Sequence, residues 1–250
     1  MKLKQQITNW LKSYYNLHNL NAFVVGISGG IDSAVTSTLC AKTNKKTIVI
    51  TMPINQNPEE TDRGKKHISW LKEKYYNVEE INLDLSNIFS QFKKSTPDRF
   101  HTKLSLANLK ARIRMCNLHL ISSSMNGIVV GTGNKIEDFG VGFFTKYGDG
   151  GVDISPIADL MKSEVYSLGK ELNIIHEIMN AAPTDGLWND GRTDEEQLGV
   201  SYDSLEWAMN NHNSKNLTNE QKEIIKIYNK HRKENLHKMI PIPIFKKDKT

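Results

Sequence analysis

The chain has 250 residues, of which 38% are hydrophobic and 24% charged, with a net charge of +5. No run approaches the roughly 18 apolar residues of a membrane helix, and the polar first ten residues do not resemble a signal peptide. Two cysteines without a paired motif favour a reducing compartment. We therefore expect a cytoplasmic protein with no membrane partner. The lysines occur in short, scattered pairs typical of a solvated face, so we expect a nucleotide ligand and no nucleic-acid partner.

Apolar, β-branched runs alternate with stretches of helical composition through the first half of the chain. A helix over about residues 4–15 precedes the first of these runs. This alternation predicts an α/β fold with a doubly wound, Rossmann-like parallel sheet and helices on both faces. The expected strands cover 22–27, 47–52, 78–83 and 128–131. The expected helices between them cover 33–41, 61–75 and 106–122.

Beyond Pro156 the pattern becomes mostly helical and predicts extra C-terminal helices. These expected helices cover 160–172, 195–209 and 219–234. Two stretches, 91–101 and 182–193, are predicted as loops, the second because it is rich in Pro, Gly, Asp and Asn. No composition shift marks a boundary, so we expect residues 1–250 to form a single domain.

The most informative motif follows the first expected strand. Gly26 and Ile27 end that strand, and Ser28-Gly29-Gly30-Ile31-Asp32-Ser33 lead into a helix. Glycines, hydroxyls and a helix N-terminus together build a phosphate cradle. A carboxylate at Asp32 would repel phosphate without a cation between them, so the motif also predicts Mg²⁺. No lysine follows the glycines, which weakens the case for a P-loop kinase or GTPase.

A similar arrangement follows the fourth expected strand. Gly131-Thr132-Gly133-Asn134-Lys135-Ile136-Glu137 again joins glycines, a hydroxyl and an acid. In a doubly wound sheet two such loops can face one crevice. We expect Thr132 to contact the nucleotide and Glu137 to meet Asp32 across the metal.

A third glycine-rich run covers residues 142–153, with the sequence GFFTKYGDGGVD. Its glycine density predicts backbone lying close to a bulky group. Lys146, Asp149 and Asp153 add charges that can bind a second ligand. The run therefore predicts a second binding site beside the first.

These motifs resemble the N-type ATP pyrophosphatases and, among them, ammonia-dependent NAD synthetase. The matching runs keep that family's order from about Tyr14 to Lys238, and GFFTKYGDGG is the most specific. One departure is that four residues separate Glu137 from Gly142, where the family usually has three. An added residue there can shift how Lys146 approaches its ligand. The remaining matching runs are 108–112, 182–185, 194–202 and 237–238.

The resemblance implies a ligase that forms a carbon–nitrogen bond in the last step of NAD biosynthesis. The carboxylate of deamido-NAD would attack ATP to give an acyl-adenylate and pyrophosphate, and ammonia would then displace AMP. ATP is the co-substrate and Mg²⁺ the implied cofactor. No glutaminase domain accompanies the motifs, so ammonia is the expected nitrogen donor. The family's active site forms between two subunits, which implies a homodimer.

The resemblance also assigns roles to single residues. Asp32 and Glu137 would hold Mg²⁺. By resemblance Lys162 contacts the ATP phosphates, and we expect it to act catalytically there. That Asp149 is the catalytic group that handles the ammonium proton is our own hypothesis. The ATP-binding residues would be the 26–33 loop with Thr132, Lys162 and Thr184. The residues expected to bind deamido-NAD are Tyr14, Asn108, Arg112, Lys146, Asp153, His237 and Lys238.

Two other readings compete with this one. Enzymes that share the phosphate loop include GMP synthetase and tRNA-modifying adenylating or thiolating enzymes, but the chain lacks an RNA-binding module and a C-x-x-C relay. A nucleotide-binding module without catalysis is the alternative from a different class. That reading would be favoured by loss of the acids at Asp32 or Glu137, and both acids are present.

Overall fold

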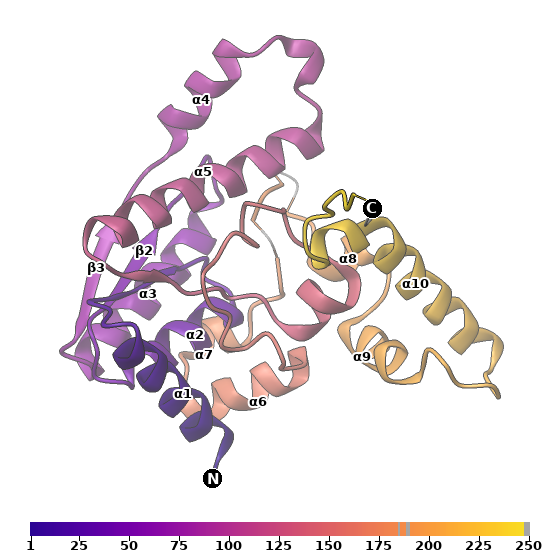
Figure 1. The fold of residues 1–250 in the computed structure, drawn as a ribbon, viewed down its shortest axis with the longest axis horizontal. Helices are drawn as coiled ribbons and strands as arrows, with labels where there is room; N and C mark the ends of the chain where they lie inside the picture. Colours follow the sequence, from indigo (N-terminus) through magenta and orange to yellow (C-terminus); the bar gives the residue numbers. More distant parts are fainter. Residues whose placement is uncertain (185, 189–190, 248–250) are drawn as a thin grey trace.

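The computed structural model describes residues 1–184, 186–188 and 191–247 as a parallel sheet with helices packed around it (Figure 1). The strands are β1 Phe23–Gly26, β2 Thr47–Thr51, β3 Val78–Asn82 and β4 Ile128–Val129. The α-helices are α1 Leu3–Leu17, α2 Ile31–Ala41, α3 Pro58–Lys74, α4 Ser86–Ser95, α5 Lys103–Ser124, α6 Lys162–Leu172, α7 His176–Met179, α8 Asp194–Leu198, α9 Tyr202–Asn211 and α10 Asn219–Met239. A 3₁₀-helix, η1, covers Asp98–Phe100, and a π-helix, η2, covers Lys135–Val141.

Within the described residues the sheet order is β3-β2-β1-β4 and all pairs are parallel. Phe23 of β1 aligns with Thr47 of β2 on one side and with Ile128 of β4 on the other. The direction of winding thus reverses between β1 and β4, and ligand crevices of open α/β sheets form at such a point. The predicted fold class and the two loops facing one crevice are confirmed in this arrangement.

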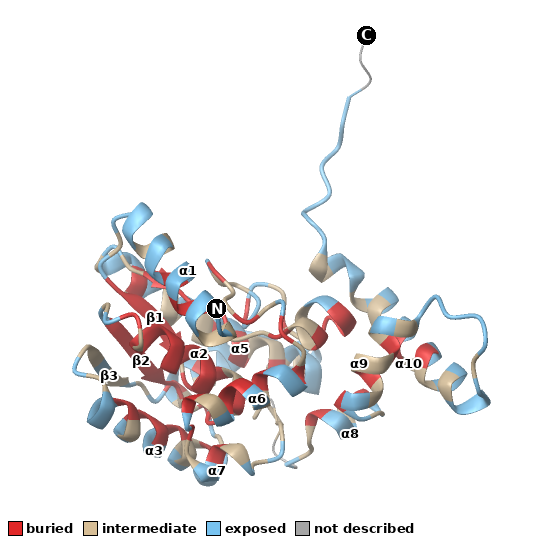
Figure 2. Cartoon of the chain, turned by 90° about the horizontal axis from the view of Figure 1, so that it is seen from below, coloured by how far each residue is buried: buried red, intermediate tan, exposed pale blue. Residues whose placement is uncertain are grey.

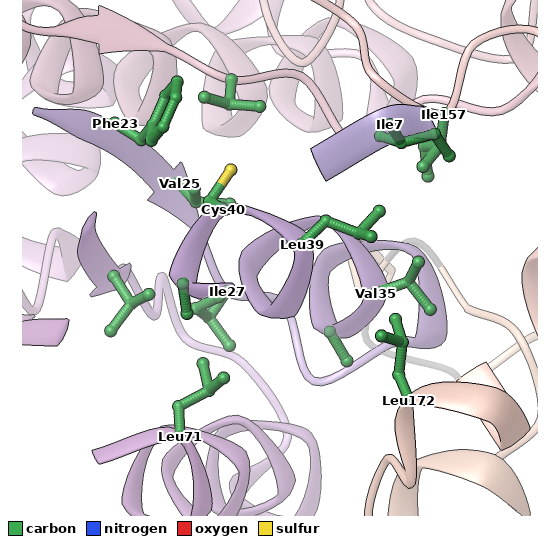
Figure 3. Packing of buried hydrophobic residues seen from close by; sticks show 14 of the residues in the cluster. Ile7, Phe23, Val25, Ile27, Val35, Leu39, Cys40, Leu71, Ile157 and Leu172 are labelled. Carbon is green, nitrogen blue, oxygen red and sulfur yellow. The ribbon is translucent and has the colours of Figure 1, made fainter. Parts of the chain in front are cut away.

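Alternate residues of β1 face opposite layers of helices. Phe23 and Val25 belong to one core cluster with Leu39 of α2 and Leu71 of α3, as Figure 3 shows. Val24 points the other way, into a second cluster with side chains of α4 and α5. A strand buried on both faces is the expected environment of a central parallel strand. Helices cover both faces, as the alternating sequence pattern predicts.

The C-terminal helices have a core of their own. α8, α9 and α10 pack around the π-helix η2 and lie to one side of the sheet (Figure 1). Tyr202, Leu205 and Tyr228 are buried there together with Ile136 of η2. Because η2 directly follows the second glycine loop, this helical group is attached to one wall of the crevice.

Two predictions about local structure are wrong. Much of the expected loop 91–101 belongs to α4 and η1; Ile88, Phe89 and Phe92 have helical spacing, and Phe89 is buried in the second cluster. The single helix expected over 195–209 is two helices. Gly199 ends α8 with φ of +78°, and Ser201 caps the start of α9 through its side chain. The expected loop 182–193 lies partly outside the described residues.

Burial is concentrated in the sheet and the helices around it, whereas residues 240–247 extend away from the molecule and are exposed (Figure 2). None of the helices in the described part of the chain combines the length and the apolar character that a membrane crossing requires.

His67 of α3 is a fully buried polar residue in the core. Its side chain is 0% exposed, and its Nε2 lies 3.0 Å from Ser37 Oγ. The Ser37 hydroxyl donates to the Ser33 carbonyl at 2.7 Å, so the Nε2–H of a neutral His67 donates to Ser37. Burial lowers the pKa of His67 to about 3. The folded protein therefore keeps this imidazole neutral.

We expect acid to destabilise the protein through His67. The unfolded chain binds a proton near pH 6.5 whereas the folded chain does so only near pH 3, so stability is lost as the pH falls between these values. The loss should reach about 2 kcal/mol between pH 8 and pH 5. Urea titrations at both pH values should show a smaller loss for His67→Gln than for the wild type. The exposed His212→Gln is the control, and equal losses in all three proteins would contradict the assignment.

Candidate functional site

A pocket of about 250 Å³ opens at the carboxyl ends of β1 and β4. The loop after β1 forms one wall and the loop after β4 the other, and α3, α5 and the segment 181–184 close the sides. The predicted residues that line it are Gly26, Ile27, Ser28, Gly29, Gly30, Ile31, Asp32, Ser33, Thr132, Glu137, Asp149, Lys162 and Thr184. The structure thus brings the residues expected to bind ATP and metal into one cavity.

The first loop is held in shape by its two serines. Ser28 Oγ and Ser33 Oγ are 3.1 Å apart, and the Ser33 hydroxyl donates to the Gly30 carbonyl at 3.0 Å. Gly30 is the N-cap of α2, so the unpaired N–H groups of the first helical turn face the loop. These donors and the helix dipole favour an anion at this position.

Position 29 requires glycine both because of its backbone angle and because of the atoms around it. Its φ is +88°, in the region that favours glycine. A Cβ at Gly29 would collide with the Glu60 carbonyl and lie 3.2 Å from the Gly64 nitrogen of α3. α3 therefore packs directly against the phosphate loop, which it can do only because residue 29 has no side chain.

The floor of the pocket holds an ion-pair cluster from three elements. Lys162 Nζ, at the start of α6, lies 2.6 Å from Asp32 Oδ2 of α2 and 2.9 Å from Glu137 Oε1 of η2. Lys162 is only 3% exposed, and its ammonium lies 4.8 Å from the centre of the Tyr202 ring. Two acids far apart in the sequence thus converge on one cation.

The protonation states of this cluster follow from its contacts. Burial alone would lower the pKa of Lys162, but the charges of Asp32 and Glu137 outweigh burial and raise it. Burial alone would raise the pKa of Glu137, but the charge of Lys162 and hydrogen bonds from Lys162 and Tyr202 lower it. Tyr202 donates its hydroxyl to Glu137 Oε1 at 2.6 Å. Lys162 is therefore charged and Glu137 ionised.

Asp32 and Glu137 also fit the predicted Mg²⁺. Their carboxylates already meet around one cation, and carboxylate oxygens are ligands that Mg²⁺ accepts. Among the described residues no group of three or more His, Cys, Asp or Glu side chains is arranged to hold a metal ion. Mg²⁺ is commonly bound by one or two carboxylates together with substrate phosphates, so two protein ligands suffice.

Asn134 connects the two glycine loops. It is 0% exposed, and its amide nitrogen donates to Asp32 Oδ1 at 3.0 Å. Its carbonyl oxygen accepts from the Ile136 and Glu137 nitrogens and so caps the start of η2. One amide therefore fixes the spacing of the two carboxylates predicted to hold the metal.

The four residues between Glu137 and Gly142 belong to the π-helix η2. The Gly142 nitrogen donates to the Glu137 carbonyl five residues earlier, which is the hydrogen-bond spacing of a π-helix. Asp138 of this turn lines the pocket, and a Cβ at Gly133 would collide with its carboxylate. Burial and then the neighbouring carboxylates, Glu137 first, raise the pKa of Asp138 well above its ordinary value.

Side chains of α10 donate hydrogen bonds to the end of the π-helix η2 and to the backbone that follows it. Arg232 donates to the Phe139 carbonyl and, at 3.0 Å, to that of Gly140. Asn235 donates to the Val141 carbonyl at 3.0 Å, and Lys238 donates to those of Gly142 and Phe144 at 2.9 and 2.8 Å. Spaced three residues apart, these donors lie on one face of α10. Lys238, expected to bind deamido-NAD, is thus a backbone donor here.

Most other residues expected to bind deamido-NAD surround the glycine-rich run beside the pocket. Arg112 donates from Nε and Nη2 to the Lys146 carbonyl, both at 3.3 Å. Lys146 Nζ donates to the His237 carbonyl at 2.8 Å. Asn108 accepts from the Thr145 hydroxyl at 2.7 Å. These residues form a connected group outside the pocket lining, so the structure gathers them without assigning them a ligand.

Tyr14 and Asp153 lie apart from both groups. Tyr14 of α1 packs between Trp10 and His18, the residue that follows the helix, and against the first core cluster. Asp153 Oδ2 accepts from the Val129 nitrogen at 2.8 Å and so secures the end of β4. Asp149 does line the pocket, where its Oδ1 accepts from the Thr145 nitrogen at 3.0 Å.

Several pocket residues were not predicted. Arg63 and Arg114 reach the pocket from α3 and α5, and Asp138 reaches it from η2. Tyr202 contacts Glu137 from α9 across 65 residues of sequence. The acid pair Glu137-Asp138 and the position of Asn134 between the glycines and Glu137 were the available signals. For Arg63 and Tyr202 the sequence offers no local signal, because their contacts are made only in the folded chain.

We expect Asn134→Ala to cost more stability than removal of an ordinary helix cap. It removes the cap of η2 and also leaves Asp32 without its amide donor, so the loss should be roughly 2–3 kcal/mol. Thr218→Ala, which removes the exposed cap of α10, should cost only about 1 kcal/mol. Urea denaturation at pH 7.5 measures both, and equal losses would mean that the link to Asp32 contributes nothing.

Comparison with known proteins shows the family of the chain. Residues 3–250 match the model of the NAD synthase family. An NH(3)-dependent NAD(+) synthetase of Carboxydothermus hydrogenoformans is 39% identical over 205 residues, which cover 81% of this chain and 82% of the relative. The structure of an NMN synthetase from Francisella tularensis is 31% identical, with a TM-score of 0.86 and coverage of 97% of this chain and 96% of its own.

The structure of an NH3-dependent NAD synthetase from Campylobacter jejuni is 25% identical, with a TM-score of 0.78 and coverage of 98% of this chain and 100% of its own. Together these relatives confirm the family predicted from the motifs and, with it, the class of ligases that form a carbon–nitrogen bond. The chain belongs to the NAD synthase family.

Proposed function

We propose that this protein amidates the nicotinate carboxylate of deamido-NAD with ammonia, at the expense of ATP, to give NAD, AMP and pyrophosphate. The observation that carries the proposal is the pocket in which the phosphate loop and the Lys162–Asp32–Glu137 cluster meet. The family match and relatives named as ammonia-dependent synthetases support the reaction and the nitrogen donor.

A carboxylate is a poor electrophile because attack by ammonia would have to expel oxide. In the proposed first step a carboxylate oxygen attacks the α-phosphorus of ATP, and the bond from that phosphorus to the bridging oxygen breaks. The electron pair leaves with pyrophosphate, and an acyl-adenylate remains. In the second step ammonia attacks the carbonyl carbon, loses a proton, and AMP leaves. Both steps depend mainly on positioning and charge neutralisation.

Residues of the chain supply these requirements. The N–H groups at the start of α2, with Ser28 and Ser33, would hold the phosphates. Mg²⁺ bound by Asp32 and Glu137 would offset the charge that develops on the leaving group. Lys162 already offsets both carboxylates and would keep the acidic floor from repelling the nucleotide.

The group around residues 142–149 suits the second substrate. Arg112, Lys146 and Lys238 place cationic side chains beside the pocket, and deamido-NAD is anionic. We propose that this group binds deamido-NAD, with Arg112 and Lys146 as its anion contacts. A homodimer that completes the site, a cytoplasmic location and a single domain covering the chain remain parts of the proposal.

One structural similarity favours a second candidate for the carboxylate substrate that is amidated. The NMN synthetase of F. tularensis matches this fold with the higher TM-score of the two structures above. An NMN synthetase forms the amide of a mononucleotide, so the corresponding acceptor is nicotinic acid mononucleotide. Its carboxylate is chemically the same as that of deamido-NAD, and the same two steps apply.

Product analysis by mass spectrometry tests the proposal. The purified protein is incubated with ATP, Mg²⁺, ammonium and either deamido-NAD or nicotinic acid mononucleotide, with parallel tubes that contain glutamine for ammonium or EDTA for Mg²⁺. We expect NAD, AMP and pyrophosphate in equal amounts, from ammonium only and not with EDTA. NMN in place of NAD would select the second acceptor. ATP bound but never cleaved would support a binding module instead.

Asp149 is the proposed acceptor of the ammonium proton. Asp149→Asn keeps an oxygen that can accept from the Thr145 nitrogen, so the loop should retain its shape. We expect amide formation to fall roughly a hundredfold. ATP–pyrophosphate exchange without ammonium, which reports acyl-adenylate formation, should stay within about threefold, because it needs no proton transfer. The exposed Asp62→Asn is the matched control, and an equal fall in both steps would refute this role.

A further inference from the structure

Arg63 is a cation of the nucleotide pocket to which neither the motifs nor the family resemblance assigns a role. It lines the same cavity as the loop 28–33, although it comes from α3. The next residue, Gly64, lies against Gly29 of the phosphate loop, where a Cβ on Gly29 would be 3.2 Å from the Gly64 nitrogen. Arg63 is therefore positioned one residue from the contact between α3 and the phosphate cradle.

The Arg63 guanidinium is not engaged by the part of the chain that the structure describes. It makes no ion pair and no hydrogen bond with those residues, and its Nε is buried without a partner. An unsatisfied buried donor carries a desolvation cost, which is greater for a charged group. A guanidinium has five donors and no acceptor, so only an acceptor group can satisfy it. An anion in the pocket would provide such acceptors.

The balance of acidic and basic side chains that line the pocket also supports a phosphate-binding role for Arg63. The described lining residues include three basic side chains, Arg63, Arg114 and Lys162. Lys162 is bound to two carboxylates, and Arg114 donates to the Met52 carbonyl and to Gln56 Oε1. The phosphate loop itself contains no lysine. The lining acids outnumber these cations; they are Asp32, Glu60, Glu137, Asp138, Asp149 and Asp194.

From this geometry we propose that Arg63 binds the β- and γ-phosphates of ATP and then the pyrophosphate that leaves. This inference deepens the proposed function and rests on it. The planar guanidinium can hold two phosphate oxygens at once, which a lysine cannot do. As the bond between the α-phosphorus and the bridging oxygen breaks, the electron pair moves onto pyrophosphate. Arg63 offsets the charge that accumulates there.

A purely structural Arg63 would behave differently from a ligand-binding one. Removal of a residue that stabilises the fold lowers Tm of the ligand-free protein. Removal of a buried donor without a partner should leave that Tm unchanged or raise it. Thermal stability without ligand, and its increase on ligand binding, therefore separate the two roles.

The test uses the full chain and inorganic pyrophosphate with Mg²⁺ as the probe. Arg63→Gln removes the charge, and Arg63→Lys keeps a point charge without the paired donors. Lys65→Gln, an exposed cation two residues along α3, is the matched control. Calorimetry should show pyrophosphate binding weakened roughly tenfold or more in Arg63→Gln and to a lesser degree in Arg63→Lys. Lys65→Gln should bind like the wild type.

Two further readouts complete the test. The pyrophosphate-induced rise in Tm should be reduced in Arg63→Gln, while the Tm of its ligand-free form is not lowered. The KM for ATP should rise without a change in the KM for the carboxylate substrate. Pyrophosphate binding within twofold of the wild type in Arg63→Gln would overturn the assignment. If Arg63→Gln does not fold, the same criterion applies to Arg63→Lys.

The outcomes also separate this inference from the proposed function. Pyrophosphate binding does not depend on which carboxylate the enzyme uses. A wild-type protein that yields no amide, but whose pyrophosphate binding requires Arg63, would refute the proposed function alone. A wild type that makes NAD, with undiminished pyrophosphate binding in Arg63→Gln, would refute the role of Arg63 alone.

Discussion

The arrangement of the site depends on one buried ammonium group. Lys162 lies between Asp32 and Glu137 at 2.6 and 2.9 Å, and these three residues belong to α6, α2 and η2. A pair of buried carboxylates without this cation would repel each other and favour the neutral acids. With the cation they can stay charged side by side, and the loops that carry them stay in one crevice. Asn134 and Tyr202, which carry no charge, then fix the orientation of the two carboxylates by donating hydrogen bonds to them.

The pocket combines a phosphate loop that is held in shape with backbone N–H groups that have no hydrogen-bond partner within the helix. Ser28 and Ser33 hold the phosphate loop by hydrogen bonds within the loop itself, and α3 packs closely against Gly29. The first turn of α2 still presents N–H groups that the helix cannot pair. Donors that are fixed before the ligand arrives need not be ordered when it binds, so less free energy is lost on binding. This preorganisation is what a reaction governed by positioning requires.

The sequence predicted those features that depend on neighbouring residues. Alternating apolar runs gave the parallel sheet, and the two glycine loops were recognised because each lies within seven consecutive residues. The loop prediction for 91–101 failed because polar composition outweighed the helical spacing of Phe89 and Phe92, and tertiary burial of Phe89 decided the outcome. The contacts of Tyr202 with Glu137, and of Lys238 with Gly142, join segments far apart in the chain. No local pattern contains such information.

The π-turn at Lys135–Val141 links two parts of the chain that are distant in sequence. The carbonyl groups at the end of this turn and just after it accept hydrogen bonds from Arg232, Asn235 and Lys238 of α10. A turn shortened by one residue would point these carbonyls elsewhere, and the three side chains would lose their acceptors together. A change in the length of the turn would therefore require matching changes on that face of α10. Descendants of this chain should keep or lose both as one inherited unit.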